Sequence, residues 1–288
     1  MDTDAASITW FLIPGVAGPL WFWVRAWRAP SRSRLARWAA GAGVVLTATN
    51  VDPVRKRLGR ARRIRSTMAL PLWWLASIRI IRPNFPAAWA SPMPALVAYL
   101  AGAILAELTA PDLVGTDPPI RQASLLPRRL EDYAPAWIRV LPWLLIALAG
   151  LLLALAPLLP HPLEDPIRTV AVIAGAVLVA GAAEVTGRRI VGRPQRSTDP
   201  DLLAADDGLR ATGVAVTTGA SVLMATLALS GAIVAAWPDQ MGWFALVPVA
   251  ALLTLQATSV GVWWTIVQQE TWGHRLRHRQ PDPAVAPC

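Results

Sequence analysis

Two glutamates, Glu107 and Glu184, are the only carboxylates inside the predicted apolar spans of this chain. A charged side chain near the bilayer centre costs roughly 2.5 to 3.5 kcal/mol by insertion scales, so such a residue is a functional candidate. Both glutamates lie within a turn of the predicted inner end of a span, where this cost is smaller. They could form a proton or cation site in an inner vestibule. They could instead be structural carboxylates that pair with arginines; Arg188, four residues after Glu184, has the favourable spacing.

The second group of candidates is cationic. It comprises Arg55, Lys56, Arg57, Arg60, Arg62, Arg63 and Arg65 in VDPVRKRLGRARRIRS (51–66), and Arg128 and Arg129 in PRRLEDYAPAW. Beside a membrane span, such residues hold the chain against the anionic headgroups of the inner leaflet, at about 1 kcal/mol each near the surface. They can also dock an acidic region of a cytoplasmic protein. No helix-turn-helix or similar module accompanies them, so we expect no nucleic acid partner.

The sequence contains no recognisable enzyme or cofactor motif. G-x-S-x-G, H-E-x-x-H, the P-loop and G-x-G-x-x-G are all absent. His274 and His278 share a helix face but lack a third ligand and lie among cations, which makes a poor metal site. Asp206 and Asp207 are adjacent and do not face each other as acid/base carboxylates must, so we interpret them as a polar loop face. We therefore expect a protein that is not an enzyme and has no cofactor.

The elements that must position these residues are membrane helices. Of the 288 residues, 55% are hydrophobic and only 16% are charged, and the mean hydropathy is +0.43; soluble domains carry about 25% charged residues. Several apolar stretches approach the roughly 20 residues that cross a bilayer. We predict an all-α, polytopic transmembrane bundle in which 1–288 form a single integral membrane domain. The seven predicted spans are 8–24, 68–81, 90–109, 138–159, 167–186, 211–236 and 241–267.

The distribution of cations predicts the orientation. Lys and Arg are retained on the cytoplasmic side of a membrane. With the N-terminus outside and the C-terminus inside, 24 of the 27 cations face inward, twelve of them in the basic cytoplasmic segment 25–66 and three in the tail 268–288. Only one of 38–50 and 68–81 can cross without breaking this bias. The large apolar side chains of LPLWW favour 68–81, but the sequence leaves the choice open.

Two inner loops show helical signals. In PRRLEDYAPAW, the apolar residues Leu130, Tyr133, Ala134 and Trp137 recur at helical spacing, which predicts a short amphipathic helix in the inner interface. In STDPDLLAADDGLRAT, Thr198 or Asp199 can cap a helix whose first residue is Pro200. We expect Gly208 to end that helix before the sixth span.

The chain also contains a candidate internal repeat. A shift of 77 residues superposes AILAELT (103–109) on AGAAEVT (180–186), and with it Glu107 on Glu184. Each heptapeptide is followed by a basic loop and another span. The pattern favours a parallel repeat of 90–160 and 167–236, as some transporters have.

Three stretches together resemble a known type of sequence: YLAGAILAELT, RQASLLPRRLEDYAPAW and VGRPQRSTDPDLLAADDGLRATG. Over about 95–240, they are similar to a family of uncharacterised multi-pass membrane proteins of high-GC Gram-positive (actinobacterial) bacteria. The resemblance implies a plasma-membrane location and carries over no catalytic or binding residue.

Two functions follow from the sequence. The first is a non-enzymatic membrane subunit or scaffold that docks a cytoplasmic partner, an ATPase or a regulator. The alternative is a small-solute or ion transporter that uses Glu107 and Glu184.

Overall fold

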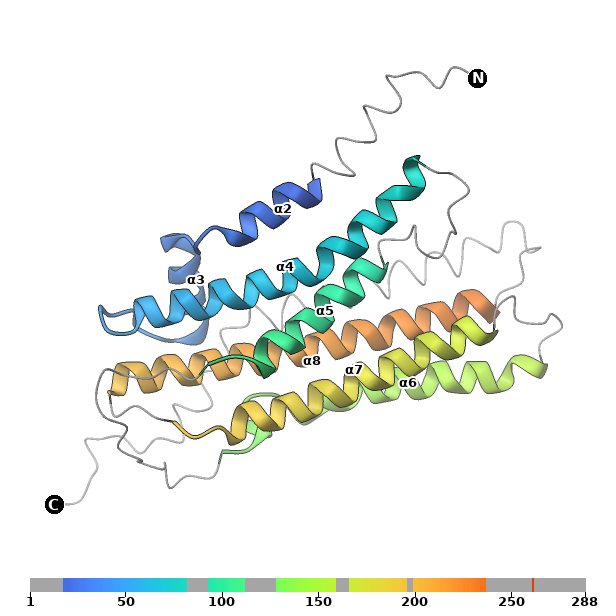
Figure 1. The fold of residues 1–288 in the computed structure, drawn as a ribbon. Coiled ribbons are helices and arrows are strands. Elements are labelled where there is room, and N and C mark those ends of the chain that lie inside the picture. The colour runs from blue at the N-terminus through green and yellow to red at the C-terminus, as the bar shows by residue number, and fades with distance from the viewer. Residues whose placement is uncertain are drawn as a thin grey trace. The chain divides into compact units, whose positions relative to one another are not determined.

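The computed structural model describes residues 18–81, 93–111, 128–158, 166–195, 199–236 and 261. Within these residues the protein is all-α, as predicted, with seven α-helices and two short 3-10 helices (Figure 1). The elements are α2 (Gly18–Trp27), α3 (Arg32–Ala42), α4 (Val51–Ile81), α5 (Met93–Leu108), η3 (Leu130–Asp132), α6 (Ala136–Leu155), η4 (Ala156–Leu158), α7 (Pro166–Gly192) and α8 (Pro200–Ala236).

Three of the described helices are long and apolar enough to cross a membrane: α6, the Thr169–Gly192 part of α7, and α8. The Ala95–Leu108 part of α5 is apolar but shorter. These helices coincide with the predicted third to sixth spans, and they indicate a membrane protein. The predicted span 241–267, apart from residue 261, and residues 8–17 of the first span lie outside the described residues.

The segment between α3 and α4 bears on the choice of the second span. α3 ends at Ala42, Gly43 has a φ of 63°, and a turn leads to Asn50. The buried Asn50 side chain closes this turn, because it accepts a hydrogen bond from Thr47 N and donates one to Val45 O, both at 2.9 Å. Residues 38–50 therefore lack the continuous helix that crossing lipid requires. Residues 68–81, by contrast, belong to α4.

The predicted amphipathic helix at PRRLEDYAPAW is wrong. The chain forms the single 3-10 turn η3, and α6 begins only at Ala136, with Pro135 as its N-cap. Proline disfavours the helical conformation of the preceding residue, which separates the two elements. Tyr133 is buried whereas Trp137 is 62% exposed, so these side chains do not share a face.

The helix start at Pro200 is confirmed, but the predicted end at Gly208 is wrong. Asp199 Oδ1 accepts a hydrogen bond from Asp201 N at 2.8 Å, which satisfies a backbone donor of the first turn of α8. α8 then continues through Gly208 to Ala236. A glycine inside a helix costs only about 1 kcal/mol relative to alanine. The predicted loop helix and the sixth span are therefore one helix.

The chain divides into two compact units. The first unit contains Met1–Trp38, Val45–Ile120 and Arg196–Ala205, and the second contains Ala39–Val44, Arg121–Gln195 and Asp206–Cys288. In the second unit, small side chains of α7 and α8 pack closely. Ala176 and Ala180 form a buried cluster with Ala225 and Ala228, next to Ile146 of α6. Small residues allow helix backbones to approach each other, as is typical of membrane helices. The single integral domain and the internal repeat stay predictions.

In the first unit, α4 packs against both α2 and α5. α4 and α5 approach each other closely at Gly102, where an added Cβ would lie 3.0 Å from Arg65 Cα and 3.0 Å from Met68 Cβ. A backbone atom cannot give way as a flexible side chain does. The absence of a side chain at Gly102 therefore permits this crossing.

Replacing Gly102 with alanine should lower the free energy of unfolding by about 1 to 3 kcal/mol, because the new methyl group overpacks the contact. Denaturant unfolding of the detergent-solubilised protein measures this loss. Gly150→Ala in α6 is the matched control, since a Cβ there meets no heavy atom within 4 Å. Equal stability of the two variants would contradict the close crossing.

Candidate functional site

The first carboxylate candidate, Glu107, is buried near the C-terminal end of α5 and lies between two arginines of α4. Its Oε2 is 3.2 Å from Arg57 Nη2, and its Oε1 is 3.7 Å from Arg65 Nη2. The Glu107 side chain is 6% exposed, and those of Arg57 and Arg65 are 11% and 17% exposed. Glu107 is therefore the centre of a buried ion cluster that ties α5 to α4.

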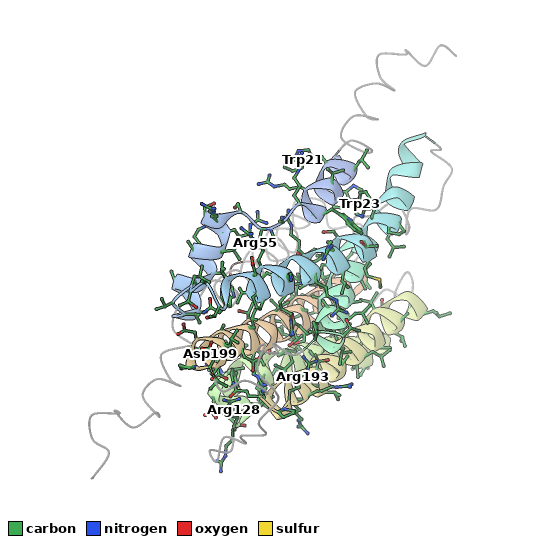
Figure 2. The ribbon with its side chains drawn as sticks, turned by 60° about the vertical axis from the view of Figure 1, so that its left-hand side comes forward. Trp21, Trp23, Arg55, Arg128, Arg193 and Asp199 are labelled. Carbon is green, nitrogen blue, oxygen red and sulfur yellow. The ribbon has the colours of Figure 1, made fainter. Side chains whose placement is uncertain are left out.

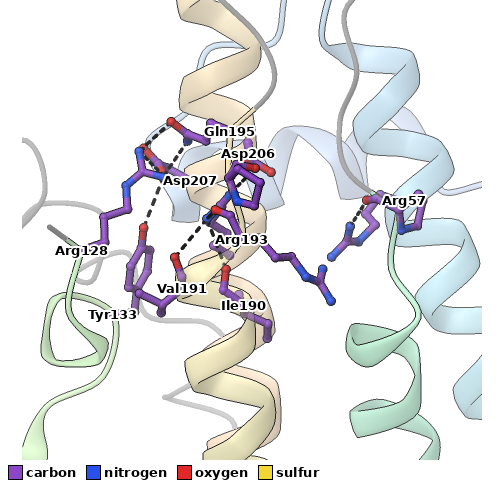
Figure 3. A network of polar contacts seen from close by, with 12 residues as sticks. Arg57, Arg128, Tyr133, Ile190, Val191, Arg193, Gln195, Asp206 and Asp207 are labelled. Atoms are coloured by element: carbon purple, nitrogen blue, oxygen red, sulfur yellow. Dashed lines mark hydrogen bonds and ion pairs between the residues drawn. The ribbon is translucent and has the colours of Figure 1, made fainter. Parts of the chain in front are cut away.

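Arginines of α4 also cap the end of α5. Arg57 donates to the carbonyl oxygen of Pro111 (Figure 3), and Arg60 donates to that of Thr109. Thr109 and Pro111 directly follow Leu108, the last residue of α5, so these arginines hold the chain where it leaves the helix. Three of the seven basic side chains in 51–66 thus have an internal structural role.

The second carboxylate candidate, Glu184, is also held by two arginines. Arg139 of α6 donates to both carboxylate oxygens, with Nη2–Oε1 at 2.7 Å and Nε–Oε2 at 3.4 Å. Arg188 Nη2 lies 3.0 Å from Glu184 Oε1, which confirms the predicted pair four residues apart. Arg139 Nη1 also lies 3.0 Å from Glu131 Oε1 in η3. The cluster joins α6, α7 and η3 within the second unit.

Glu184 lines a small pocket in the second unit. The other polar lining residues are Arg139, Thr218 and Ser221, and the wall includes Trp143. Its water-accessible volume is about 10 Å³, which is roughly the space of one water molecule. The pocket has a mixed polar and apolar lining and has no room for a larger solute in this conformation.

A third polar cluster surrounds Asp207. Its carboxylate accepts hydrogen bonds from Gln195 Nε2 at 3.1 Å and Tyr133 Oη at 3.3 Å, and it lies 3.4 Å from Arg128 Nη2 (Figure 3). Arg128 Nη2 also donates to Gln195 Oε1 at 2.7 Å. The interpretation of Asp206 and Asp207 as a polar loop face is therefore wrong. Because α8 continues through this region, both residues lie on a helix whose surface is covered by the chain around 128–133 and 195.

Arg210 is a structural residue that the sequence analysis missed. It is 5% exposed, and its Nε lies 2.7 Å from Asp206 Oδ2, one helical turn earlier. Its guanidinium donates to four backbone carbonyl oxygens at the end of α7. They belong to Ile190, Val191, Arg193 and Pro194, at 3.2, 3.3, 2.7 and 3.4 Å. Arg210 thus caps α7 from α8. In the sequence, the only sign of this arrangement is the four-residue spacing of Asp206 and Arg210, which is the spacing of an ion pair on a helix.

The structure separates the basic candidates into two groups. Arg57, Arg60, Arg65 and Arg128 are engaged in the contacts above, and Arg55 lies 3.8 Å from the exposed Asp52. Lys56, Arg63 and Arg129 are exposed, and Arg62 is half-buried. Docking or lipid anchoring by this set would therefore rest mainly on the second group.

Within the described part of the chain, no group of three or more His, Cys, Asp or Glu is placed to hold a metal ion. His274 and His278 lie outside the described residues. Comparison with protein-family models, curated proteins and solved structures finds no match for this chain. The resemblance to an actinobacterial membrane-protein family stays a prediction.

The environment of Tyr133 predicts a pH effect. Burial of the phenol, followed by the negative charge of Asp207, raises the pKa of Tyr133 well above its usual value of 10.0. Above pH 10 the unfolded chain ionises this phenol while the folded protein does not, so stability should fall as the pH rises beyond 10. Tyr133→Phe should remove this part of the fall.

Tyrosinate absorbance provides the measurement, because the chain contains only two tyrosines. The wild-type spectrum minus the Tyr133→Phe spectrum isolates the Tyr133 phenol. A difference signal that titrates at the ordinary pKa in the folded protein would contradict the buried contact with Asp207.

Proposed function

We propose that this chain is a non-enzymatic subunit or scaffold of the bacterial plasma membrane that docks a cytoplasmic partner, an ATPase or a regulator. The observation that carries the proposal is that each of the two carboxylate candidates is held by two arginines. These clusters join helices and leave other cations exposed. Helices that are joined by ion pairs in this way are better suited to binding a partner at an exposed surface than to passing a solute between them.

The proposal includes seven spans, with the N-terminus outside and the C-terminus inside. The three long apolar helices and the predicted inward placement of cations support it. In this orientation the exposed residues Lys56 and Arg129 face the cytoplasm. We expect each of them, Lys56 in the first unit and Arg129 in the second, to meet acidic groups of a partner, where complementary charge raises the association rate and selects the partner.

Transport is the second candidate function, because Glu184 lines a pocket together with the polar residues Arg139, Thr218 and Ser221. A proton or cation that binds Glu184 would have to compete with Arg139 and Arg188, both within 3.0 Å of the carboxylate. Transport would thus require a second conformation in which these pairs separate and the pocket grows.

Purification of the tagged full-length protein from its own membranes in mild detergent tests the scaffold. We expect a cytoplasmic protein in stoichiometric amount and at least a tenfold lower recovery with Lys56→Gln/Arg129→Gln. Arg128 stays unchanged, since neutralising it would disturb the Asp207 cluster. Arg28→Gln/Arg32→Gln removes the same charge from two exposed positions and should retain the partner. Recovery of the chain alone would refute the proposal.

Reconstituted vesicles discriminate between the two functions. The scaffold predicts no solute or proton flux above that of empty vesicles. A pH-dependent flux that Glu184→Gln and Glu107→Gln abolish, at normal protein levels in the vesicles, would establish the transporter instead.

A further inference from the structure

The N-terminal third of the chain has far more cations than carboxylates. Between residues 5 and 106 there are fourteen Arg and Lys residues, and Asp52 is the only acidic residue. Asp52 lies near Arg55, and the next carboxylate, Glu107, is engaged by Arg57 and Arg65. Most of the remaining positive charge must therefore be balanced by anions from outside this stretch.

Part of this charge gathers where α2, α3 and α4 meet in the first unit. Pro30, in the link between α2 and α3, is buried against Gly59 of α4, with its Cδ 3.4 Å from the position of a Cβ at Gly59. One turn further along α4, the Arg63 guanidinium lies over the Trp27 ring, 5.5 Å from its centroid. These contacts hold the end of α2 and the start of α3 beside residues 59–63.

Arg25 of α2 and Arg34 of α3 both lie near enough to Arg62 of α4 for their charges to act on it. Burial lowers the pKa of Arg62, and the charges of Arg34 and Arg25 lower it further. Arginine side chains keep their positive charge in proteins. A cluster of this kind repels itself and is relieved by a bound anion, and a guanidinium fork matches phosphate oxygens in geometry.

The face of α2 next to this cluster is apolar and exposed. Leu20, Trp21, Val24 and Trp27 are 44%, 60%, 41% and 51% exposed and follow one side of the helix. Trp21 points to one side of α2 and Trp23 to the other (Figure 2), and the Arg25 guanidinium lies 4.8 Å from the Trp21 ring centroid. Tryptophan beside arginine on an amphipathic helix is typical of the membrane interface. The combination fits an anion that carries hydrocarbon, which a free phosphate or an acidic protein surface does not supply.

We propose that Arg25, Arg34 and Arg62 bind the phosphate group of an anionic phospholipid of the inner leaflet. Trp21 and Trp27 lie at the level of the headgroup, and the acyl chains cover the apolar face of α2. The assignment to the inner leaflet rests on the proposed orientation, but the lipid site does not depend on the proposed docking function, because it is made by other residues and needs no partner protein.

The test uses purified full-length protein in mild detergent, titrated separately with phosphatidylglycerol, phosphatidylcholine and inorganic phosphate. Native mass spectrometry counts bound lipid, and thermal unfolding gives the shift in Tm. We expect phosphatidylglycerol to bind and raise Tm and the other two probes to have little effect. The variant Arg25→Gln/Arg34→Gln/Arg62→Gln should bind phosphatidylglycerol about 100-fold more weakly, from the surface contribution of three cations.

Arg28→Gln/Arg32→Gln/Arg37→Gln is the matched control, because it removes three exposed arginines from the same segment. It should weaken binding less than the first variant does, because these three arginines are not the ones gathered around Arg62. If the first triple variant fails to fold, Arg62→Gln is compared with Arg32→Gln.

Several results would overturn the proposal. Equal weakening by both triple variants would mean diffuse attraction without a site. An equal Tm shift with inorganic phosphate would mean a free-anion site, and equal binding of phosphatidylcholine would mean apolar adhesion alone. Unchanged lipid binding together with loss of a co-purified acidic protein from the first variant would assign the cluster to protein docking.

Discussion

Replacing Glu107 with alanine is expected to lower the free energy of unfolding by about 3 to 5 kcal/mol, the usual loss when one partner of a buried ion pair is removed. The substitution leaves the buried guanidinium groups of Arg57 and Arg65 without their shared counter-charge. It also loosens the contact of α4 with α5. Glu107→Gln keeps the shape and one acceptor, so its loss should be smaller. Denaturant unfolding in detergent measures both variants.

Asp52→Asn is the control for Glu107→Ala. Its side chain is 70% exposed and lies 3.8 Å from Arg55, so its neutralisation should change the free energy of unfolding by less than about 1 kcal/mol. If Glu107→Ala were no more destabilising than Asp52→Asn, the Glu107 cluster would not brace the first unit, and the argument against a transport role for Glu107 would lose its basis.

Arg210→Met should be similarly destabilising, by about 3 to 5 kcal/mol. Methionine keeps much of the side-chain volume but removes every donor to the four carbonyls at the end of α7, and it leaves Asp206 without its partner. Arg210→Lys retains the charge but lacks the planar fork, so it should recover only part of the loss. Hydrogen exchange of the last turn of α7 should speed up in both variants, more so in Arg210→Met.

Arg189→Gln provides the comparison for Arg210. Arg189 lies in the last turn of α7 and is exposed, and surface substitutions usually change stability by no more than about 0.5 kcal/mol. Similar exchange rates in Arg210→Met and Arg189→Gln would show that the end of α7 does not depend on the cap from α8.

The local part of this architecture could be predicted from the sequence. Long apolar runs located α5, α6, α7 and α8, since a run of apolar residues can be recognised from composition alone. The Asp199–Pro200 start of α8 and the Glu184–Arg188 pair followed from spacing within one helix. The helix start and the ion pair each involve residues at most four positions apart, where helix geometry determines which side chains meet.

The features that could not be predicted depend on partners distant in the chain. Arg57 meets Glu107 from 50 residues away, and Arg128 meets Asp207 from 79 residues away. The distribution of charge identified these arginines as cations near a membrane interface. It did not show which of them form ion pairs within the folded protein. The two wrong helix predictions have local causes: Pro135 interrupts a periodic apolar pattern, and Gly208 does not interrupt α8.

The exposure of Lys56 on α4 has a practical consequence, because it is the only lysine in the chain. An amine-reactive ester that cannot cross membranes has one side-chain target here, and peptide mapping can locate the adduct without ambiguity. With the proposed orientation, Lys56 should stay unmodified in intact cells and react in inside-out vesicles. Because all the other basic residues counted among the 27 Lys and Arg are arginines, Lys56 is a built-in reporter of sidedness that needs no engineered label.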